Sequence, residues 1–337
     1  MSHSSPGRPS NPRIVFLDRE TLPPQTYLRP PAFAHESVVY PNTKAEEVAE
    51  RIRDADIVIT NKVPLTEAAL DAAHRLRLVA VAATGVDNID LRACQLRDIS
   101  VCNVRNYALH SVPEHAFALI FALRRNLLAY SKSVQAGRWA DSGMFCFFDH
   151  PIRDLAGATL GIIGAGVLGK AVGQIGHALG MKVLFAARKG SEGMSPFYTP
   201  FEAVLEQSDV ISLHCPLTPA TRGLIGAAEF ERMVRCPLLI NTARGGLVDE
   251  GALIIALNEG RISGAGFDVA TEEPPTESHP LWQLVGRADF ILTPHVAWAS
   301  NEAVQTLADQ LIDNIDSWYA HAPRNNVVVN CLTTAKT

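Results

Sequence analysis

A single histidine, His295, lies in the apolar stretch ILTPHVAWAS at residues 291–300. Histidine changes its protonation state near neutral pH, so this side chain could carry a proton to or from a substrate. The chain holds 11 histidines, and many histidines in folded proteins have only structural or surface roles. The stretch alone leaves two interpretations open: a proton carrier, or a buried ring satisfied by one backbone group.

A glycine-rich stretch, LGIIGAGVLGK at residues 160–170, places Gly164, Gly166 and Gly169 in the spacing GxGxxG. The residues before it have the apolar pattern of a strand, and those after it the pattern of a helix. In that context the first glycine makes a tight turn, the second lets the backbone approach a pyrophosphate, and the third lets helix and strand pack closely. The helix N-terminus offers free N–H groups to an anion. The motif predicts a dinucleotide-binding site.

The end of the next predicted strand bears on the choice between NAD(H) and NADP(H). NAD sites usually place an acidic residue for the ribose diol about 20 residues beyond the glycine motif. Here Ala187 stands at that position, and Arg188 and Lys189 follow. These cations would attract a 2′-phosphate, which an acid would repel. The sequence favours NADP(H), and NAD(H) is the alternative if both cations belong to a solvated loop.

The elements that must position these residues form two alternating series of strands and helices. The first series has predicted strands at 13–18, 56–61, 78–83 and 99–104, and helices at 46–55 and 65–76. The second has predicted strands at 159–165, 182–187, 209–215, 237–243, 262–269 and 288–294, and helices at 167–180 and 252–260. Short apolar runs separated by amphipathic helices are typical of parallel sheets with helices on both faces. We expect two doubly wound α/β domains.

Two longer helices connect these series. Apolar spacing predicts a helix over 111–127, with Ser111 and Glu114 as a capping box, and a final helix over 301–320 that returns to the first domain. The expected architecture is a Rossmann cofactor domain inserted into a flavodoxin-like substrate domain. Its expected division is a flexible tail at 1–12, a substrate domain at 13–105 and 300–337, and a dinucleotide-binding domain at 106–299.

The segment at 137–157 is linker-like and carries the aromatic residues Trp139, Phe145, Phe147 and Phe148. Together with the apolar face of the helix at 111–127, it exceeds what one small domain can cover. Exposed aromatic clusters usually mark an interface. We therefore expect a homodimer, since twofold dimers are the commonest assemblies.

Composition and charge bear on several classes of function. The 337 residues are 47% hydrophobic with a formal net charge of −5, which is typical of a globular protein and gives no reason to expect a nucleic-acid partner. No run of about 18 uncharged apolar residues predicts a membrane span, and residues 1–13 lack the apolar core of a signal peptide. The six cysteines form no CxxC pair. We expect reduced packing thiols of a cytoplasmic protein, and no metal site.

Further motifs match one protein family. NTARGGLVDE (241–250), GFDVATEEPP (266–275) and TPHVAWAS (293–300) resemble the D-isomer-specific 2-hydroxyacid dehydrogenases, and among these the hydroxypyruvate/glyoxylate reductases, or glycerate dehydrogenases. The matching motifs keep the family order over residues 13–330. The resemblance implies an NAD(P)-dependent oxidoreductase that interconverts a small 2-keto acid and its D-2-hydroxy acid, with hydroxypyruvate and glyoxylate as favoured substrates. Alternatives are 3-phosphoglycerate or D-lactate as substrate, or a cofactor-sensing, corepressor-like protein.

The resemblance places the family's catalytic set on Arg244, Glu273 and His295. Reduction of a 2-keto acid needs a hydride on the carbonyl carbon and a proton on its oxygen, and a histidine can give that proton. A neighbouring glutamate would favour the charged imidazole and orient its ring. An arginine presents a fork of donors that fits the carboxylate and polarises the carbonyl.

The resemblance also implies binding residues. Cofactor contacts fall on Val167, Leu168, Cys215, Pro216, Thr242, Ala243, Arg244, Asp268 and His295. The glycine motif and the two cations discussed above add Gly164, Gly166, Gly169, Arg188 and Lys189. Substrate contacts fall on Val63, Gly85, Val86, Arg244 and His295. Burial of Asp268 would be unfavourable unless its carboxylate bonds to a cofactor or to a cap. Two pairs depart from the family pattern: Arg105-Asn106 replaces a common Pro-Gly, and Ala270-Thr271 replaces an aromatic-acid pair.

Overall fold

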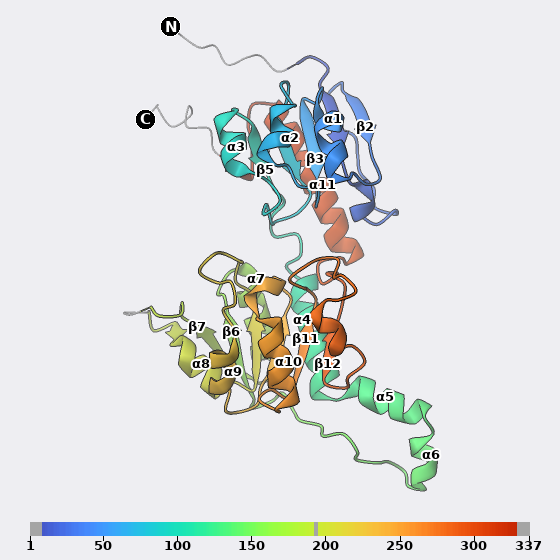
Figure 1. Cartoon of the computed structure of the whole chain (residues 1–337), viewed down its shortest axis with the longest axis vertical. Coiled ribbons are helices and arrows are strands. Elements are labelled where there is room, and N and C mark those ends of the chain that lie inside the picture. The colour runs from blue at the N-terminus through green and yellow to red at the C-terminus, as the bar shows by residue number, and fades with distance from the viewer. Residues whose placement is uncertain (1–8, 192–194, 329–337) are drawn as a thin grey trace. The chain divides into compact units, whose positions relative to one another are not determined.

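The computed structural model describes residues 9–191 and 195–328. The chain forms two compact units, here called unit 1 (residues up to 107 and from 300 onward) and unit 2 (residues 108–299) (Figure 1). The expected divisions were at 105/106 and 299/300. Most of the tail expected at 1–12 lies outside the described residues.

Unit 1 is built on a six-stranded sheet with the order β13-β5-β4-β3-β1-β2. Its strands are β1 (Arg13–Phe16), β2 (Glu36–Val39), β3 (Ile57–Thr60), β4 (Leu78–Val81), β5 (Ser100–Cys102) and β13 (Asn326–Val328). Neighbours pair in parallel, except that β13 is antiparallel to β5. The five parallel strands have the order 2-1-3-4-5 of flavodoxin-like folds.

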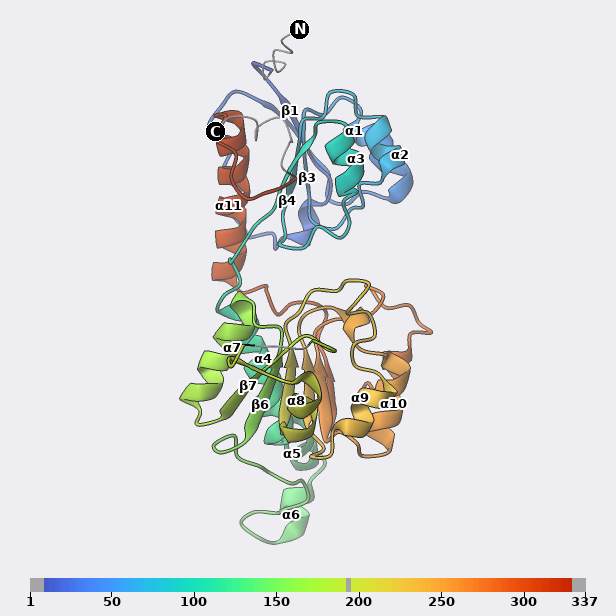
Figure 2. The same ribbon diagram turned by 90° about the vertical axis from the view of Figure 1, so that its left-hand side faces the viewer.

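Helices cover both faces of the unit 1 sheet. Three short helices lie on one face and one long helix on the other (Figure 2): α1 (Val48–Ile52), α2 (Glu67–Asp71) and α3 (Leu91–Leu96), opposite α11 (Asn301–Tyr319). The long helix buries Leu307, Leu311 and Ile315, which lie four residues apart on one face. Ser300 caps this helix by accepting the Ala303 N–H at 3.1 Å.

Unit 2 contains a seven-stranded parallel sheet with the order β12-β11-β10-β9-β6-β7-β8. Its strands are β6 (Thr159–Ile163), β7 (Lys182–Ala186), β8 (Tyr198–Thr199), β9 (Val210–Leu213), β10 (Leu238–Asn241), β11 (Gly264–Phe267) and β12 (Phe290–Leu292). Six of these strands follow the Rossmann order 3-2-1-4-5-6, and β12 extends it. The prediction of two doubly wound parallel sheets is confirmed.

Each face of the unit 2 sheet has its own apolar core. The helices α4 (Ser111–Arg124) and α7 (Val167–Ala178) cover one face, and α8 (Phe201–Gln207), α9 (Ala227–Arg232) and α10 (Glu250–Asn258) cover the other. Phe117, Ile120 and Leu123 of α4 are buried against the strands. The apolar face of α4 is therefore used within unit 2, and the expectation that it was surplus was wrong.

The described residues also form short 3-10 helices: η1 (Arg19–Thr21), η2 (Ala45–Glu47), η3 (Gly245–Leu247) and η4 (Pro280–Gln283). Among the residues that the structure describes, no helix is long and apolar enough to cross a membrane.

The helix expected at 111–127 differs from the prediction at both ends. His110 occupies the N-cap position without a side-chain cap, and Ser111 Oγ instead donates to Trp298 O at 3.3 Å, so the predicted capping box was wrong. The helix ends at Arg124, and Asn126 has a left-handed φ of 51°. The chain then forms an arm over residues 127–152, with α5 (Leu127–Gln135) and α6 (Arg138–Ser142), that extends from the body of unit 2 (Figure 1).

Candidate active site

The candidate residues of unit 2 follow the carboxyl ends of its parallel strands. The glycine loop follows β6, Arg244 follows β10, Asp268 follows β11, and His295 follows β12. Because β10, β11 and β12 are parallel neighbours in the sheet, the segments that follow them all begin at the carboxyl ends of these strands. Open α/β sheets bind their ligands at this carboxyl edge of the sheet.

Glu273 and His295 form a direct pair. His295 Nδ1 lies 2.6 Å from Glu273 Oε2, and the two side chains are 26% and 35% exposed. The carboxylate fixes the proton on Nδ1 and leaves Nε2 to exchange a proton with another molecule. The ring is therefore paired with a carboxylate and is partly accessible, so the interpretation of a buried ring satisfied by one backbone group does not hold.

The backbone around His295 is held by the carboxylate of Asp268. His295 has a left-handed φ of 54°, which is uncommon for a residue other than glycine and persists where its surroundings fix it. Asp268, only 1% exposed, accepts hydrogen bonds from Val296 N at 2.9 Å, Ala297 N at 2.7 Å and Thr293 Oγ1 at 2.5 Å. The carboxylate of Asp268 thus holds the backbone turn after His295, and its contact with the cofactor stays a prediction.

Arg244 is held on the turn after β10. The buried Asn241 donates through Nδ2 to Arg244 O at 2.9 Å and accepts the Ala243 N–H at 3.1 Å. The next residue, Gly245, packs directly on the peptide between Ala270 and Thr271, because an added Cβ would lie 2.0 Å from the Ala270 carbonyl carbon. The structure thus brings the turn of Arg244 against the loop that carries Glu273.

The glycine loop combines close packing with open space. A Cβ at Gly164 would lie 2.5 Å from the His214 carbonyl carbon, and one at Gly169 would lie 2.0 Å from Gly164 O. A Cβ at Gly166 would meet nothing within 4 Å, and this residue is the N-cap of α7. The first and third glycines therefore let the chain pack, and the second leaves room beside free N–H groups for an anion.

A buried hydroxyl also fits a bound dinucleotide. Thr242 Oγ1, at the carboxyl end of β10, is buried and has no hydrogen-bond partner within the described part of the chain. A buried polar atom without a partner is unfavourable, and a ligand would supply one. Together with the open Gly166, this atom shows that the residues present fit the cofactor implied by the motif.

The two cations after β7 differ in their surroundings. Lys189 Nζ forms an ion pair with Glu229 Oε1 at 2.7 Å, and Glu229 also accepts the Gly226 N–H at 3.0 Å. The Arg188 side chain is exposed and makes no ion pair or hydrogen bond with the residues that the structure describes. Arg188 is therefore the more available of the two for a phosphate.

The residues after β9 are uncharged at neutral pH. Burial lowers the pKa of His214 to about 4, and its Nε2 lies 2.8 Å from Ser212 Oγ. Burial raises the pKa of Cys215 to about 11. The His214 ring is thus neutral at this pH, and the backbone of His214 packs on Gly164.

In unit 1, Val63, Gly85 and Val86 lie beyond the carboxyl ends of the neighbouring strands β3 and β4. Their loops are joined by Asn88, whose Nδ2 donates to Val63 O at 3.0 Å. The buried Asp18 accepts the N–H groups of residues 61–63 at 2.6 to 3.2 Å. Asp18 and Asn88 were not among the predicted site residues, because a side chain that holds the backbone of a loop has no signature in the sequence.

The two departures from the family pattern have structural consequences. Asn106 adopts a left-handed φ of 59°, which asparagine tolerates, and Arg105 Nε donates to Asn103 Oδ1 at 3.0 Å. The backbone N–H groups of Ala270 and Thr271 donate to the carboxylates of Glu273 at 3.0 Å and Glu250 at 2.8 Å.

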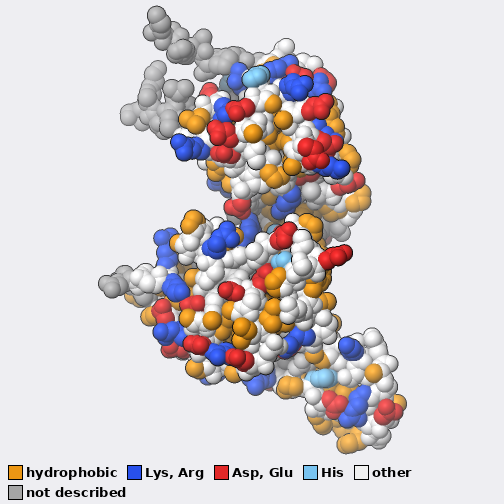
Figure 3. All heavy atoms as spheres, in the orientation of Figure 1, with side chains coloured by type: hydrophobic (Ala, Val, Ile, Leu, Met, Phe, Trp, Pro, Cys, Tyr) orange, Lys and Arg blue, Asp and Glu red, His pale blue; other side chains and the backbone are white. Residues whose placement is uncertain are grey.

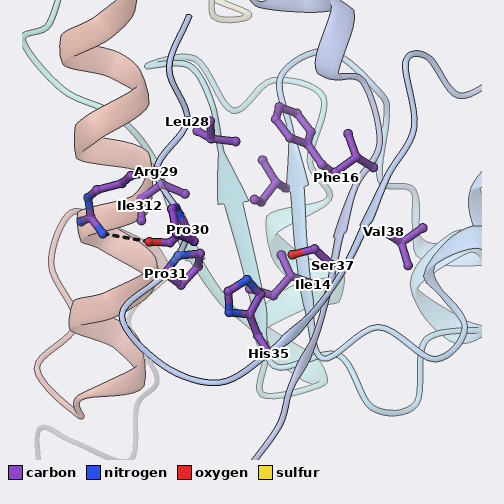
Figure 4. A pocket seen from close by; sticks show the side chains of 12 residues that line it. Ile14, Phe16, Leu28, Arg29, Pro30, Pro31, His35, Ser37, Val38 and Ile312 are labelled. Carbon is purple, nitrogen blue, oxygen red and sulfur yellow. Dashed lines mark hydrogen bonds between the residues drawn. The ribbon is translucent and has the colours of Figure 1, made fainter.

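A separate cavity of about 240 Å³ lies in unit 1 and contains none of the candidate site residues. It lies between β1, β2 and the segment before β2 (Figure 4). Its lining is mostly apolar, and its one arginine, Arg29, is already paired with Asp313 at 2.6 Å and Asp316 at 2.7 Å. Within the described ranges, no three His, Cys, Asp or Glu side chains gather where they could hold a metal ion.

Comparison with known proteins shows which family has this sequence and fold. Residues 117–297 match the family model described as "D-isomer specific 2-hydroxyacid dehydrogenase, NAD binding domain". The chain is 49% identical to the glycerate dehydrogenase of Methylorubrum extorquens over 94% of this chain and 98% of that protein.

Two solved structures are similar over most of their length. One is the NADPH-dependent glyoxylate/hydroxypyruvate reductase of Sinorhizobium meliloti in complex with NADP and malonate: TM-score 0.80, 28% identity, covering 95% of this chain and 97% of that one. The other is the D-lactate dehydrogenase of Aquifex aeolicus complexed with NAD and lactic acid: TM-score 0.80, 26% identity, covering 94% of this chain and 99% of that one. The chain therefore belongs to the D-isomer-specific 2-hydroxyacid dehydrogenase family of oxidoreductases, as its motifs indicated.

Proposed function

We propose that this protein reduces hydroxypyruvate and glyoxylate to the corresponding 2-hydroxy acids, of D configuration where the product is chiral. The observation that carries the proposal is the 2.6 Å contact between His295 Nδ1 and Glu273 Oε2. The loop that carries Glu273 packs against the turn of Arg244. The 49% identity to a glycerate dehydrogenase and the likeness to a glyoxylate/hydroxypyruvate reductase support this choice of substrate.

Each candidate residue has a distinct task. His295 gives a proton from Nε2 to the carbonyl oxygen during reduction and takes it back during oxidation. Glu273 holds Nδ1 and stabilises the charged ring. Arg244 binds the substrate carboxylate and polarises its carbonyl. The substrate contacts expected at Val63, Gly85 and Val86 of unit 1 stay a prediction.

We propose that NADP(H) is preferred over NAD(H). When bound, the nicotinamide supplies the hydride. The N–H groups of the glycine loop, including those of Val167 and Leu168, hold the pyrophosphate. Thr242, Ala243, Cys215 and Pro216 line the same sheet edge. Arg188 recognises the 2′-phosphate. This role is supported by the neutral Ala187 at the usual acid position and by an Arg188 side chain that has no partner within residues 9–191 and 195–328.

We propose that the protein is a homodimer and that the arm at residues 127–152 forms part of the dimer interface. Phe145 and Phe148 are 86% and 83% exposed, and Figure 3 shows hydrophobic side chains on the surface of the arm, at its lower right. The arm is ordered by its own bonds, because Arg138 pairs with Asp149 at 2.7 Å and Trp139 Nε1 donates to Phe145 O at 3.0 Å. An ordered segment with exposed aromatic side chains is typical of an interface.

We also propose a cytoplasmic location. All five cysteines in the described residues are free thiols, and burial raises the pKa of Cys94 to about 11 and of Cys102 to about 12. Free, protonated thiols suit a reducing compartment.

The substrate proposal is tested by following oxidation of NADPH and NADH with glyoxylate, hydroxypyruvate, pyruvate and phosphohydroxypyruvate. We expect the highest kcat/KM with hydroxypyruvate or glyoxylate. Lys62 is the only basic residue in the loop TNKVPLT at 60–66, whereas a phosphorylated substrate would call for more basic residues there. A higher kcat/KM for pyruvate or phosphohydroxypyruvate would contradict the proposal.

A further inference from the structure

A second carboxylate–imidazole pair lies buried beside the loop that carries Glu273. Glu250 Oε2 lies 3.2 Å from His279 Nε2, and the side chains are 7% and 5% exposed. Glu250 is the first residue of α10, and His279 immediately precedes η4. A glutamate is almost never buried to this extent unless it is paired. The tasks proposed above use neither residue.

The hydrogen bonds of His279 define how this pair is arranged. The Leu281 N–H donates to His279 Nδ1 at 3.4 Å, so Nδ1 is an acceptor and the ring proton is on Nε2. The Nε2–H of His279 therefore faces the carboxylate of Glu250, with Nε2 3.2 Å from Oε2. The same carboxylate accepts the Thr271 N–H through Oε1 at 2.8 Å, and it lies in the first turn of α10, where the helix dipole favours negative charge.

The two partners of Glu250 lie on either side of Glu273 in the sequence. One carboxylate thus joins Thr271 to His279 and closes the segment at 271–279 into a loop that contains Glu273. The preceding amide, Ala270 N–H, donates to Glu273 Oε1 at 3.0 Å. Two adjacent amides therefore donate to two different carboxylates. The Thr271 amide bonds to the buried Glu250, and the Ala270 amide bonds to Glu273, which contacts His295.

The turn that carries Arg244 contacts the same peptide bond. Gly245 packs on the bond between Ala270 and Thr271, where a Cβ would be 2.1 Å from Ala270 O and 2.4 Å from Thr271 N. A shift of this peptide would therefore change the position of Glu273 relative to both His295 and the turn of Arg244. Misplacements of about 1 Å in a reacting group are enough to lower turnover.

We propose that Glu250 and His279 are positioning residues that hold the 271–279 loop so that Glu273 Oε2 meets His295 Nδ1. The inference rests on the proposed roles of Glu273 and His295. It assigns Glu250 and His279 no contact with substrate or cofactor. Their effect on turnover passes through the amides of Ala270 and Thr271.

The test compares Glu250→Ala, Glu250→Gln and His279→Phe with the parent. We expect Glu250→Ala to lower kcat by about 10–100-fold, the range for a displaced catalytic group, with little change in the KM for NADPH. Glu250→Gln keeps an oxygen for the Thr271 N–H and should recover most of that loss. His279→Phe should lower kcat in the same direction, because it leaves the carboxylate with one partner fewer.

Amide hydrogen exchange in the ligand-free protein gives a second, independent readout. In Glu250→Ala we expect faster exchange not only at Thr271, which loses its acceptor, but also at Ala270, whose acceptor is still present. The matched control is Asp209→Ala. Asp209 likewise holds a backbone N–H, that of Thr159 at 2.8 Å, but it precedes β9 at the opposite end of the sheet. This control should lose stability and keep the kcat and the Ala270 protection of the parent.

A double variant separates this inference from the function on which it rests. If Glu250 acts through Glu273, then Glu250→Ala should lower kcat far less in a Glu273→Gln background than in the parent. Fully additive losses, or a folded Glu250→Ala protein with parental kcat and slow Ala270 exchange, would overturn the inference. If Glu273→Gln alone kept the parental kcat, the proposed role of Glu273 would fail instead, while Ala270 exchange would still report on the loop.

Discussion

Replacement of Arg188 by alanine should separate the two coenzymes. The Arg188 side chain has no protein partner among the described residues, so its truncation breaks no contact that stabilises the fold. Lys189, in contrast, is already neutralised by Glu229 at 2.7 Å. Of the two cations that follow Ala187, Arg188 should therefore carry most of the discrimination in favour of a 2′-phosphate.

The size of the effect follows from the contact that is lost. A hydrogen bond to a charged group contributes about 1–3 kcal/mol, which corresponds to a fall of about 5–150-fold in kcat/KM for NADPH. NADH lacks the 2′-phosphate, so its kcat/KM should change little. Lys189→Ala should have a smaller effect on NADPH, and it should also lower stability, because it leaves the nearly buried Glu229 carboxylate with one partner fewer.

The assay is kcat/KM for NADPH and for NADH with saturating hydroxypyruvate, in the parent and in both variants. Lys182→Ala is the matched control, because Lys182 is an exposed cation at the opposite end of β7, and it should leave both values unchanged. The reasoning would be refuted by a parent that uses both coenzymes equally, or by an Arg188→Ala variant that loses the same factor with NADH as with NADPH.

Three further predictions follow from the site and the arm. Glu273→Gln should lower kcat by about 10–100-fold, because the ring of His295 loses the carboxylate that holds Nδ1; a variant with the parental kcat would contradict the pairing. The pKa of His214 in the folded protein, about 4, lies below the value of 6.5 for a free histidine, so the stability gained from its neutral ring is full above pH 6.5 and is lost as pH falls toward 4, by at most about 3 kcal/mol. His214→Gln should flatten the unfolding free energy across that window, whereas an unchanged pH dependence would count against this cause. Phe145→Glu combined with Phe148→Glu should convert a dimer to a monomer in light scattering, and a parent that is already monomeric at micromolar concentration would exclude the proposed interface.

Much of the fold could be predicted from the sequence because its central strands are buried on both faces. Strands such as β3 and β4 are wholly apolar or nearly so, and all four residues of each strand are buried. The edge strand β2 was not predicted, because its sequence ESVV is largely exposed and has no apolar run. The helices α3, α8 and α9 were not predicted, whereas α1 and α2 were, although they have only five residues each.

The candidate site could be predicted only where a motif has a fixed spacing or resembles a family. The glycine loop and the three residues Arg244, Glu273 and His295 were found in this way. The pair of Glu250 and His279 was missed, since the two residues are far apart in sequence and each is indistinguishable there from a helix cap. The Ser111 capping box failed because His110 already has helical dihedral angles, so Ser111 lies inside the first turn and not at the N-cap.

The most direct measurement is the turnover of a His295→Gln variant with NADPH and hydroxypyruvate, together with its melting temperature and its NADPH affinity. Loss of general acid–base catalysis typically lowers a rate by about 10²–10⁴-fold. We expect His295→Gln to melt near the parent, to bind NADPH, and to reduce hydroxypyruvate at least about 100-fold more slowly. A variant that keeps most of the parental kcat would show that His295 does not carry the proton, and it would contradict the mechanism built on its pair with Glu273.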